Sequence, residues 1–218
     1  MKTRILFALL GLGLLGTQSA VADSDLWLGA KGGTLGFGLE ATWRPIPFLD
    51  VRAGVNNFTY DTADAEAGIN YDKELDLSSF YATANLRPPL SPFRLTAGIF
   101  SNKNKLAMTS QQSANFDIGG MTYTSAEVGT LNASVGFDKT APYLGIGADF
   151  RIADTLGLNF DVGVLFQGTP VVGMSASGPI AQDPNFQAEL AAETMELQSA
   201  LNNYKAYPVA SIGVSFKF

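Results

Sequence analysis

Residues 207–218 read YPVASIGVSFKF, and this last stretch of the chain decides the fold. Successive side chains of a β-strand point to opposite faces. One face of this strand would be apolar to its end, with Pro208, Ala210, Ile212, Val214, Phe216 and Phe218. The other face would be mostly small or polar, with Tyr207, Val209, Ser211, Gly213, Ser215 and Lys217. The pattern predicts a membrane-spanning barrel strand, apolar toward lipid and polar toward the lumen.

The N-terminus has the three parts of a secretory signal peptide. Lys2 and Arg4 precede an apolar run over residues 5–15, and small residues ending at Ala22 offer a cleavage site. The run is shorter than the roughly 20 residues that span a bilayer, although a single N-terminal anchor helix is the alternative. The sequence therefore predicts a signal peptide over residues 1–22 and one barrel domain over residues 23–218.

Six further segments alternate in the same way as the C-terminal one. They are residues 35–44, 51–56, 80–87, 93–99, 143–151 and 158–167. Short connectors rich in Pro, Asp or Gly join three pairs of them, at residues 44–50, 87–92 and 153–157. The other connections, near residues 61–71, 109–140 and 169–205, are long. Short turns at one end and long loops at the other are typical of outer-membrane barrels.

The direction of the strands predicts one more strand. If both chain ends lie at the end with the short turns, an additional strand must precede residue 34, and residues 26–31 can form it. Gly32 and Gly33 would then make the tight turn. The fold class is therefore all-β, an antiparallel transmembrane barrel of eight strands. A ten-stranded barrel with a hairpin around Gly119 and Gly120, within residues 114–135, is one alternative, and a soluble β-sandwich is another.

The aromatic residues divide between the two predicted rims. Those beside the short turns or the chain end are Trp43, Phe48, Phe93, Phe150, Phe216 and Phe218. Those expected near the opposite rim are Phe58, Tyr60, Phe100, Phe137, Tyr143, Phe166 and Tyr207.

Residues 183–204 break the β pattern and predict a helix in the long loop before the last strand. Asp183 is a good N-cap, and Pro184 suits the first helical position. An apolar stripe at helical spacing runs from Phe186 through Leu190 to Leu201. The sequence leaves open whether this helix packs on the barrel rim, lies over the mouth or enters the lumen as a plug.

The composition excludes several functions. The chain has no histidine and no cysteine, so a Ser-His-Asp triad, a thiolate metal site and a disulfide are impossible, and zinc catalysis is not expected. Without Lys2 and Arg4, 12 basic residues face 20 acidic ones, a formal charge of −8 that disfavours a nucleic-acid partner. The acidic runs at residues 61–66 and 72–76 lack EF-hand spacing and predict solvated loops rather than a calcium site. We expect neither a cofactor nor a metal ion.

The functional content is expected in the lumen. Eight strands leave an interior just wide enough for side chains. The predicted polar network consists of Glu40, Arg44, Arg52, Arg87, Arg94, Asp149, Arg151 and Asp161. We expect structural ion pairs here. An ion path is the first alternative, and a histidine-independent catalytic carboxylate pair of Asp149 and Asp161 is the second.

These features together resemble the small Gram-negative outer-membrane β-barrel proteins of the OmpA, OmpX and OmpW type. The C-terminal GVSFKF is similar to the signal read by the barrel-assembly machinery, with Phe216 and Phe218 as its aromatic residues, and PYLGIG at residues 142–147 looks like a strand of such barrels. The resemblance implies an outer-membrane location after cleavage near Ala22, contact with outer-membrane lipid, and a non-enzymatic structural or surface-interaction role. A narrow channel for small or hydrophobic solutes, gated by the 183–204 helix, is the alternative. The oligomeric state is left open.

Overall fold

A computed structural model of the chain describes residues 25–66, 69–111 and 115–218. The predicted signal peptide and its cleavage site lie outside these residues. The strands of the first half are β1 (Asp25–Gly33), β2 (Gly36–Ile46), β3 (Leu49–Glu66), β4 (Ile69–Leu86), β5 (Phe93–Asn102), β6 (Lys105–Ser110), β7 (Phe116–Ile118) and β8 (Met121–Tyr123). The second half adds α1 (Ser125–Val128), β9 (Leu131–Gly136), β10 (Thr140–Ala153), β11 (Leu156–Phe166), β12 (Val171–Ala176), the 3₁₀ helix η1 (Pro179–Gln182), α2 (Pro184–Leu201) and β13 (Ala206–Lys217).

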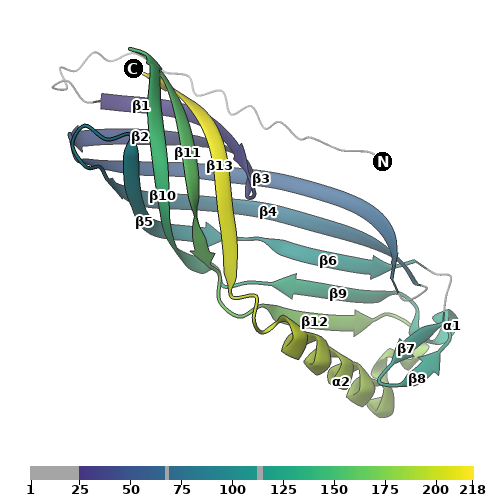
Figure 1. Ribbon diagram of the computed structural model, residues 1–218. Coiled ribbons are helices and arrows are strands. Elements are labelled where there is room, and N and C mark those ends of the chain that lie inside the picture. Colours follow the sequence, from purple (N-terminus) through teal and green to yellow (C-terminus); the bar gives the residue numbers. More distant parts are fainter. Residues whose placement is uncertain (1–24, 67–68, 112–114) are drawn as a thin grey trace, which may run out of the picture.

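Eight antiparallel strands close into a barrel, as the sequence predicts. The order around the wall is β4, β3, β2, β1, β13, β11, β10 and β5, and pairing between β4 and β5 completes the ring (Figure 1). The last strand lies between β1 and β11, with Phe216 opposite both Leu28 and Leu156. Closure leaves no free edge among these strands, so every strand has backbone partners on both sides.

The outer wall carries the predicted apolar side chains. Leu39, Leu95, Ile146 and Val162 come from four different strands, and each is more than half exposed. Small and polar residues alternate with them and face the lumen. This arrangement is the reverse of a soluble sandwich, in which these apolar residues would form the core, and it excludes that alternative.

One tight turn lies two residues beyond its predicted position. Gly32 and Gly33 remain in β1, and Thr34 and Leu35 form the turn between β1 and β2. Gly36 then takes a φ of +89°, a conformation that costs glycine little because it has no Cβ. The side chain of Leu35 consequently points inward and is buried, whereas simple alternation placed it on the lipid-facing side.

Half of the barrel wall continues beyond the ring of eight strands, and we call this part the extension. β3 and β4 are 18 residues long each, so the predicted loop over residues 61–71 is wrong: strand residues lie on both sides of the chain reversal. Residues 71–76 of β4, at the end nearer the chain reversal, pair with β6. β6 in turn pairs with β9, and β9 pairs with β12 (Figure 1). The two other long connections therefore contain strands that follow on from β5, β10 and β11.

The hairpin around Gly119 and Gly120 exists, but it does not enter the barrel. β7 and β8 form a separate two-stranded sheet, and both glycines of the turn have positive φ. This hairpin, α1 and the start of α2 bury a small hydrophobic cluster at the tip of the extension. Its buried members are Phe116, Ile118, Val128, Leu131, Phe186 and Leu190.

The helix in the last long connection is confirmed, and it begins at Pro184 as predicted. The Asp183 carboxylate accepts hydrogen bonds from the backbone N–H groups of Asn185 and Phe186, which caps the helix. The helix runs from the tip of the extension back toward the barrel, beside β12 (Figure 1). No helix in the described part of the chain is long and apolar enough to cross a membrane.

Candidate functional site

The lumen holds a network of ion pairs that the strand alternation builds. Arg52 on β3 lies at its centre, with Nη1 at 3.4 Å from a Glu40 carboxylate oxygen and at 3.2 Å from an oxygen of Asp161. Lys31 pairs with the other oxygen of Glu40 at 3.4 Å, and the Tyr81 hydroxyl donates a hydrogen bond of 2.7 Å to that oxygen. These groups come from five different strands, so only barrel closure brings them together.

A second layer of the network lies nearer the short turns. Arg94 is 1% exposed and bridges two carboxylates: Nη1 donates to Asp149 at 2.6 Å, and Nη2 donates to Asp161. Arg87 bridges Asp149 and the fully buried Asp50. Each buried charge therefore has at least one opposite charge against it, as burial in a low dielectric requires.

The remaining charges surround the mouth at the end with the short turns. The Asp25 carboxylate forms ion pairs with Lys217 Nζ at 2.6 Å and with Arg44 Nη1 at 3.0 Å. Arg151 Nη2 lies 3.9 Å from the same carboxylate. The Arg151 side chain is 62% exposed, so this residue lies at the mouth rather than within the lumen network. An open hollow at this mouth is bounded by Asp25, Arg44, Arg151 and Lys217 together with residues 45–47.

Glycines on the lumen side make room for the large polar residues. A Cβ on Gly147 would overlap the guanidinium group of Arg94, and one on Gly54 would lie 2.5 Å from the Tyr81 hydroxyl. The Tyr143 hydroxyl occupies the corresponding space at both Gly145 and Gly163. Glycine alternates with apolar residues in these strands because the large lumen side chains need the space that a Cβ would fill.

A layer of apolar side chains covers the ion pairs at the end with the extension. Tyr81 and Phe100 stack with ring centroids 4.8 Å apart, and Tyr143 packs on Phe100 at 5.3 Å. Leu35, Ala141, Leu165 and Val209 complete this cluster. Phe100 and Tyr143 thus lie toward the rim opposite the short turns, as expected, but their positions in the strands direct both rings into the lumen rather than toward lipid headgroups.

A small cavity lies between the ion pairs around Arg52 and this apolar layer. Lys31, Arg52, Asn56 and Thr83 are among its lining residues, and it has room for about two or three water molecules. The buried Thr83 hydroxyl has no protein partner, which suits a site that holds water. The described lumen residues thus leave a gap large enough for water, bordered on one side by aromatic rings such as that of Phe100 and on the other by Arg52 and Asp161.

The structure brings most of the predicted lumen residues together and adds others. Glu40, Arg52, Arg87, Arg94, Asp149 and Asp161 meet in one network. Arg44 links this network to the mouth, since its Nε lies 4.0 Å from an Asp50 oxygen, and Arg151 belongs to the mouth. Sequence reasoning missed Lys31, Asp50 and Tyr81, and it missed Asp25 at the mouth. Strand alternation could have identified two of them. Asp50 lies two residues from Arg52 and Lys31 two residues from Gly29, so each shares the lumen-facing side of its strand.

The described residues show no preformed site for a metal ion. No group of three or more Asp or Glu side chains within residues 25–66, 69–111 and 115–218 could hold one. The lumen carboxylates instead accept from arginine, lysine, asparagine and tyrosine donors. Asp149, for example, also accepts a hydrogen bond of 2.6 Å from the Asn159 amide. The arrangement resembles a polar core that replaces a hydrophobic one.

Comparison of the chain with known proteins finds relatives by structure alone. No family model matches the sequence, and no curated protein matches it. The crystal structure of CarO2 from Acinetobacter baumannii superposes with a TM-score of 0.60 at 22% identity, covering 89% of this chain and 98% of that one. CarO from the same organism gives 0.54 at 23% identity, with 89% and 97% covered. A major outer membrane protein from Thermus thermophilus gives 0.50 at 16% identity, with 89% and 99% covered.

At these identities the likeness concerns the fold. The eight-stranded ring and the apolar outer wall indicate an outer-membrane barrel. The superposed structures, each covered almost completely, indicate the same fold. The chain therefore has the fold of the small outer-membrane β-barrel proteins, with the helix α2 in the connection before its last strand.

Proposed function

We propose that the chain is an outer-membrane protein whose barrel is a closed, non-conducting anchor and whose extension presents an interaction surface outside the cell. The observation that carries this proposal is the filled lumen. Arg52 and Arg94 lie across the barrel among Glu40, Asp149 and Asp161, and the stacked Tyr81 and Phe100 cover them. A solute crossing the barrel would have to displace both layers.

The location follows from the outer wall and from the two chain ends. Exposed side chains such as Phe37, Leu95 and Ile146 need lipid around them, because water is a poor solvent for so large an apolar surface. The predicted signal peptide supplies export, and Phe216 and Phe218 supply the assembly signal. The end with short turns then faces the periplasm, and the extension faces the exterior.

The chemistry of the lumen favours a structural role over catalysis. The chain has no histidine to act as general base near neutral pH. Asp149 and Asp161, the only candidate pair from the sequence, are both bound to arginine side chains. Both carboxylates are therefore engaged as ion-pair partners, which favours a structural role for them.

The channel alternative loses its proposed gate. The helix α2 lies along β12 and the tip of the extension, and its buried residues Phe186 and Leu190 pack in the tip cluster rather than in the lumen. It neither covers the barrel mouth nor enters the lumen (Figure 1). A channel would instead require the lumen network itself to rearrange around its small cavity.

Planar-bilayer conductance tests the closed anchor. The refolded chain should insert without steady single-channel steps, whereas Arg94→Ala combined with Tyr81→Ala should produce them, because both layers lose their largest side chain. A chain that lacks residues 183–204 should stay as silent as the intact chain. Steady steps from the intact chain would refute a closed barrel and favour the channel.

Gel migration and cell fractionation test the location independently. A closed hydrogen-bonded barrel should resist detergent until boiled, so boiled and unboiled samples should migrate differently. The processed chain should also fractionate with the outer membrane. Recovery of the processed chain as a detergent-free periplasmic monomer would contradict a membrane location, whatever the conductance result.

A further inference from the structure

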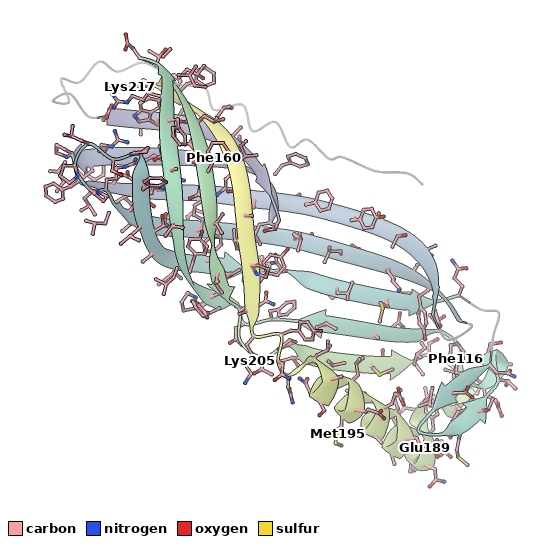
Figure 2. The ribbon with its side chains drawn as sticks, viewed as in Figure 1. Phe116, Phe160, Glu189, Met195, Lys205 and Lys217 are labelled. Carbon is pink, nitrogen blue, oxygen red and sulfur yellow. The ribbon has the colours of Figure 1, made fainter. Side chains whose placement is uncertain are left out.

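The extension has two lateral edges, and the structure covers one of them. β12 forms the covered edge, where Gln198 of α2 hydrogen-bonds to backbone groups at the start of the strand. β3 forms the other edge, because its pairing with β2 ends at Asn57 while its pairing with β4 continues. The two edges lie on opposite sides of the extension (Figure 1), and Figure 2 shows Met195 on α2, away from β3. We call residues 58–63 of β3 the open edge.

The open edge has backbone groups that no other strand uses. A strand paired on one side presents a row of N–H and C=O groups on its other side. Within the described part of the chain, β4 is the strand that pairs with residues 58–63, and no backbone hydrogen bond outside strand pairing involves them. At about 3.4 Å per residue, the open edge is about 20 Å long. An extended peptide can therefore add to it as a further strand.

The open edge lies beyond the apolar outer wall of the barrel. Val55 and Phe80 are strand partners, and they form the last large apolar pair on the outer face of β3 and β4. The next outward pair is Asn57 with Ser78. A change from apolar to polar side chains along the same strands marks the limit of the lipid. The open edge is therefore in water.

The inner side of the open edge is aromatic. The rings of Phe58 and Tyr60 stack with centroids 6.5 Å apart and planes 6° apart. Phe37 packs edge-on against Phe58 at 6.4 Å, close to the end of β2. Tyr60 is 49% exposed, so an aromatic or β-branched side chain on an added strand could pack against it. This inner side also carries Lys73, the partner of Thr62, and so disfavours a second cation.

The outer side of the open edge is acidic. Asp61 and Glu74 are strand partners and both are exposed, although like charges directly opposite each other are destabilising. Within residues 25–66, 69–111 and 115–218, no lysine or arginine lies within ion-pair distance of either carboxylate. Asp72 and Asp76 stand on either side of Glu74 along β4, and Lys105 is the strand partner of Asp76. A cation on an added strand would relieve the repulsion beside Asp61.

We propose that the open edge binds an extended segment of a partner protein by strand addition, and that this segment alternates basic side chains with aromatic or β-branched ones. The inference rests on the proposed function, because it names the surface of the extension that meets the partner. Backbone hydrogen bonds would supply affinity, and alternate side chains would supply specificity. Basic side chains would face the side of Asp61, and apolar ones would pack on Phe58 and Tyr60. A second copy of the chain is a poor occupant, because its own open edge carries the same carboxylates.

A synthetic peptide with the sequence KVKFKVK tests this inference on the mature chain in nanodiscs of phosphatidylcholine, a lipid without net charge. One comparison peptide has glutamate in place of lysine. A second keeps the lysines but has methylated backbone amides, so it retains the charge and loses the donors of a strand. Fluorescence anisotropy of labelled peptide measures affinity, and hydrogen exchange of the protein locates the contact.

Asp61→Lys combined with Glu74→Lys reverses the charge on the outer side of the open edge. Asp154→Lys combined with Glu196→Lys is the matched control, since it makes the same change in net charge at exposed residues elsewhere. The unchanged protein should bind the lysine peptide and then show slower exchange in residues 58–63. The reversed variant should bind that peptide at least about tenfold more weakly and should prefer the glutamate peptide, whereas the control variant should keep the original preference.

Equal binding of the methylated peptide would overturn strand addition, and equal binding of the lysine peptide by the reversed variant would overturn the basic partner. Slow exchange in residues 58–63 without peptide, increasing with protein concentration, would assign the open edge to a second copy and also overturn the inference. The proposed function fails in other ways. Steady conductance steps would contradict the closed anchor, and peptide binding in nanodiscs but not on intact cells would contradict the exterior position of the extension, while both results would leave strand addition supported.

Discussion

The guanidinium group of Arg94 occupies the space that a side chain on Gly147 would need, and the two residues are Cα partners across the β5–β10 pair. Arg94 cannot move aside, because it is buried and holds Asp149 and Asp161 at the same time. A glycine on one strand therefore permits a large buried charged side chain on the next. The barrel can close around its large lumen side chains because glycine stands at the facing positions of the neighbouring strands.

Gly147→Ala should lower the free energy of unfolding by about 1–3 kcal/mol, since the new methyl group overlaps a side chain held in place by two carboxylates. Urea titration of the protein in lipid vesicles, followed by tryptophan fluorescence, measures the change. Gly136→Ala on β9 is the matched control, because no atom lies within 4 Å of the position of its new Cβ. Equal losses in the two variants would show that Arg94 has space to move.

Arg94→Met should destabilise the barrel by about 3–5 kcal/mol, because it removes a charge partner of two carboxylates in the lumen. Adding Asp161→Asn should recover part of this loss, since one of those carboxylates then no longer needs a cation. The same urea titration measures all three variants as a double-mutant cycle. Purely additive effects would contradict direct coupling between the two side chains.

The tip of the extension offers a prediction of pH dependence. The hydrogen bond from the Tyr123 hydroxyl to Glu189 raises the pKa of Tyr123 to about 12. Because the folded pKa lies above the ordinary value near 10, this contact stabilises the tip fully below pH 10 and is lost as the pH rises toward 12. The difference in phenolate absorbance between the unchanged chain and Tyr123→Phe should therefore appear with a midpoint near pH 12.

Glu189→Gln should move that midpoint toward 10, since a neutral amide no longer opposes the phenolate. Glu193→Gln is the control, because Glu193 contacts the Gly119 N–H at 3.5 Å rather than the tyrosine. A midpoint that stays near 12 in Glu189→Gln would mean that another group sets this pKa.

The helix α2 protects the free edge of β12 through one side chain. Gln198 accepts from the Val172 N–H at 3.0 Å and donates to the Pro170 carbonyl at 2.6 Å. Exposed strand edges are sites of aberrant pairing, and a helix that covers one prevents it. Gln198→Ala should therefore speed hydrogen exchange at the Val172 amide severalfold without changing exchange in the barrel strands. Glu196→Ala, on the exposed side of the same helix, should leave that amide unchanged.

The barrel strands could be predicted because the pleat of a strand is a local property. Alternation in residues 37–44, 143–151 and 207–218 indicates which side chains face outward, and no knowledge of the partner strand is needed. The cap at Asp183 is local in the same way. Most residues of the lumen network, such as Arg52 and Asp161, could be predicted from the same alternation of side chains.

The extension could not be predicted in this way. Residues 61–66 carry acidic side chains that resemble those of a solvated loop, yet they remain in β3 because residues 69–74 of β4 pair with them. The pairing partner is β4, which follows the chain reversal, so the sequence of residues 61–66 alone does not indicate a strand. The position of α2 was undetermined for a similar reason, since its surroundings on β12 and at the tip exist only in the folded chain.

The amino-acid sequence by itself determined a closed tube with an apolar outside and a charged inside, because side-chain direction along a strand follows from covalent geometry. The tertiary structure alone decided which charges neutralise one another, which rings close the lumen and how far the wall continues past the membrane. Those outcomes depend on contacts between strands that are distant in the chain, and such contacts form only when the ring closes.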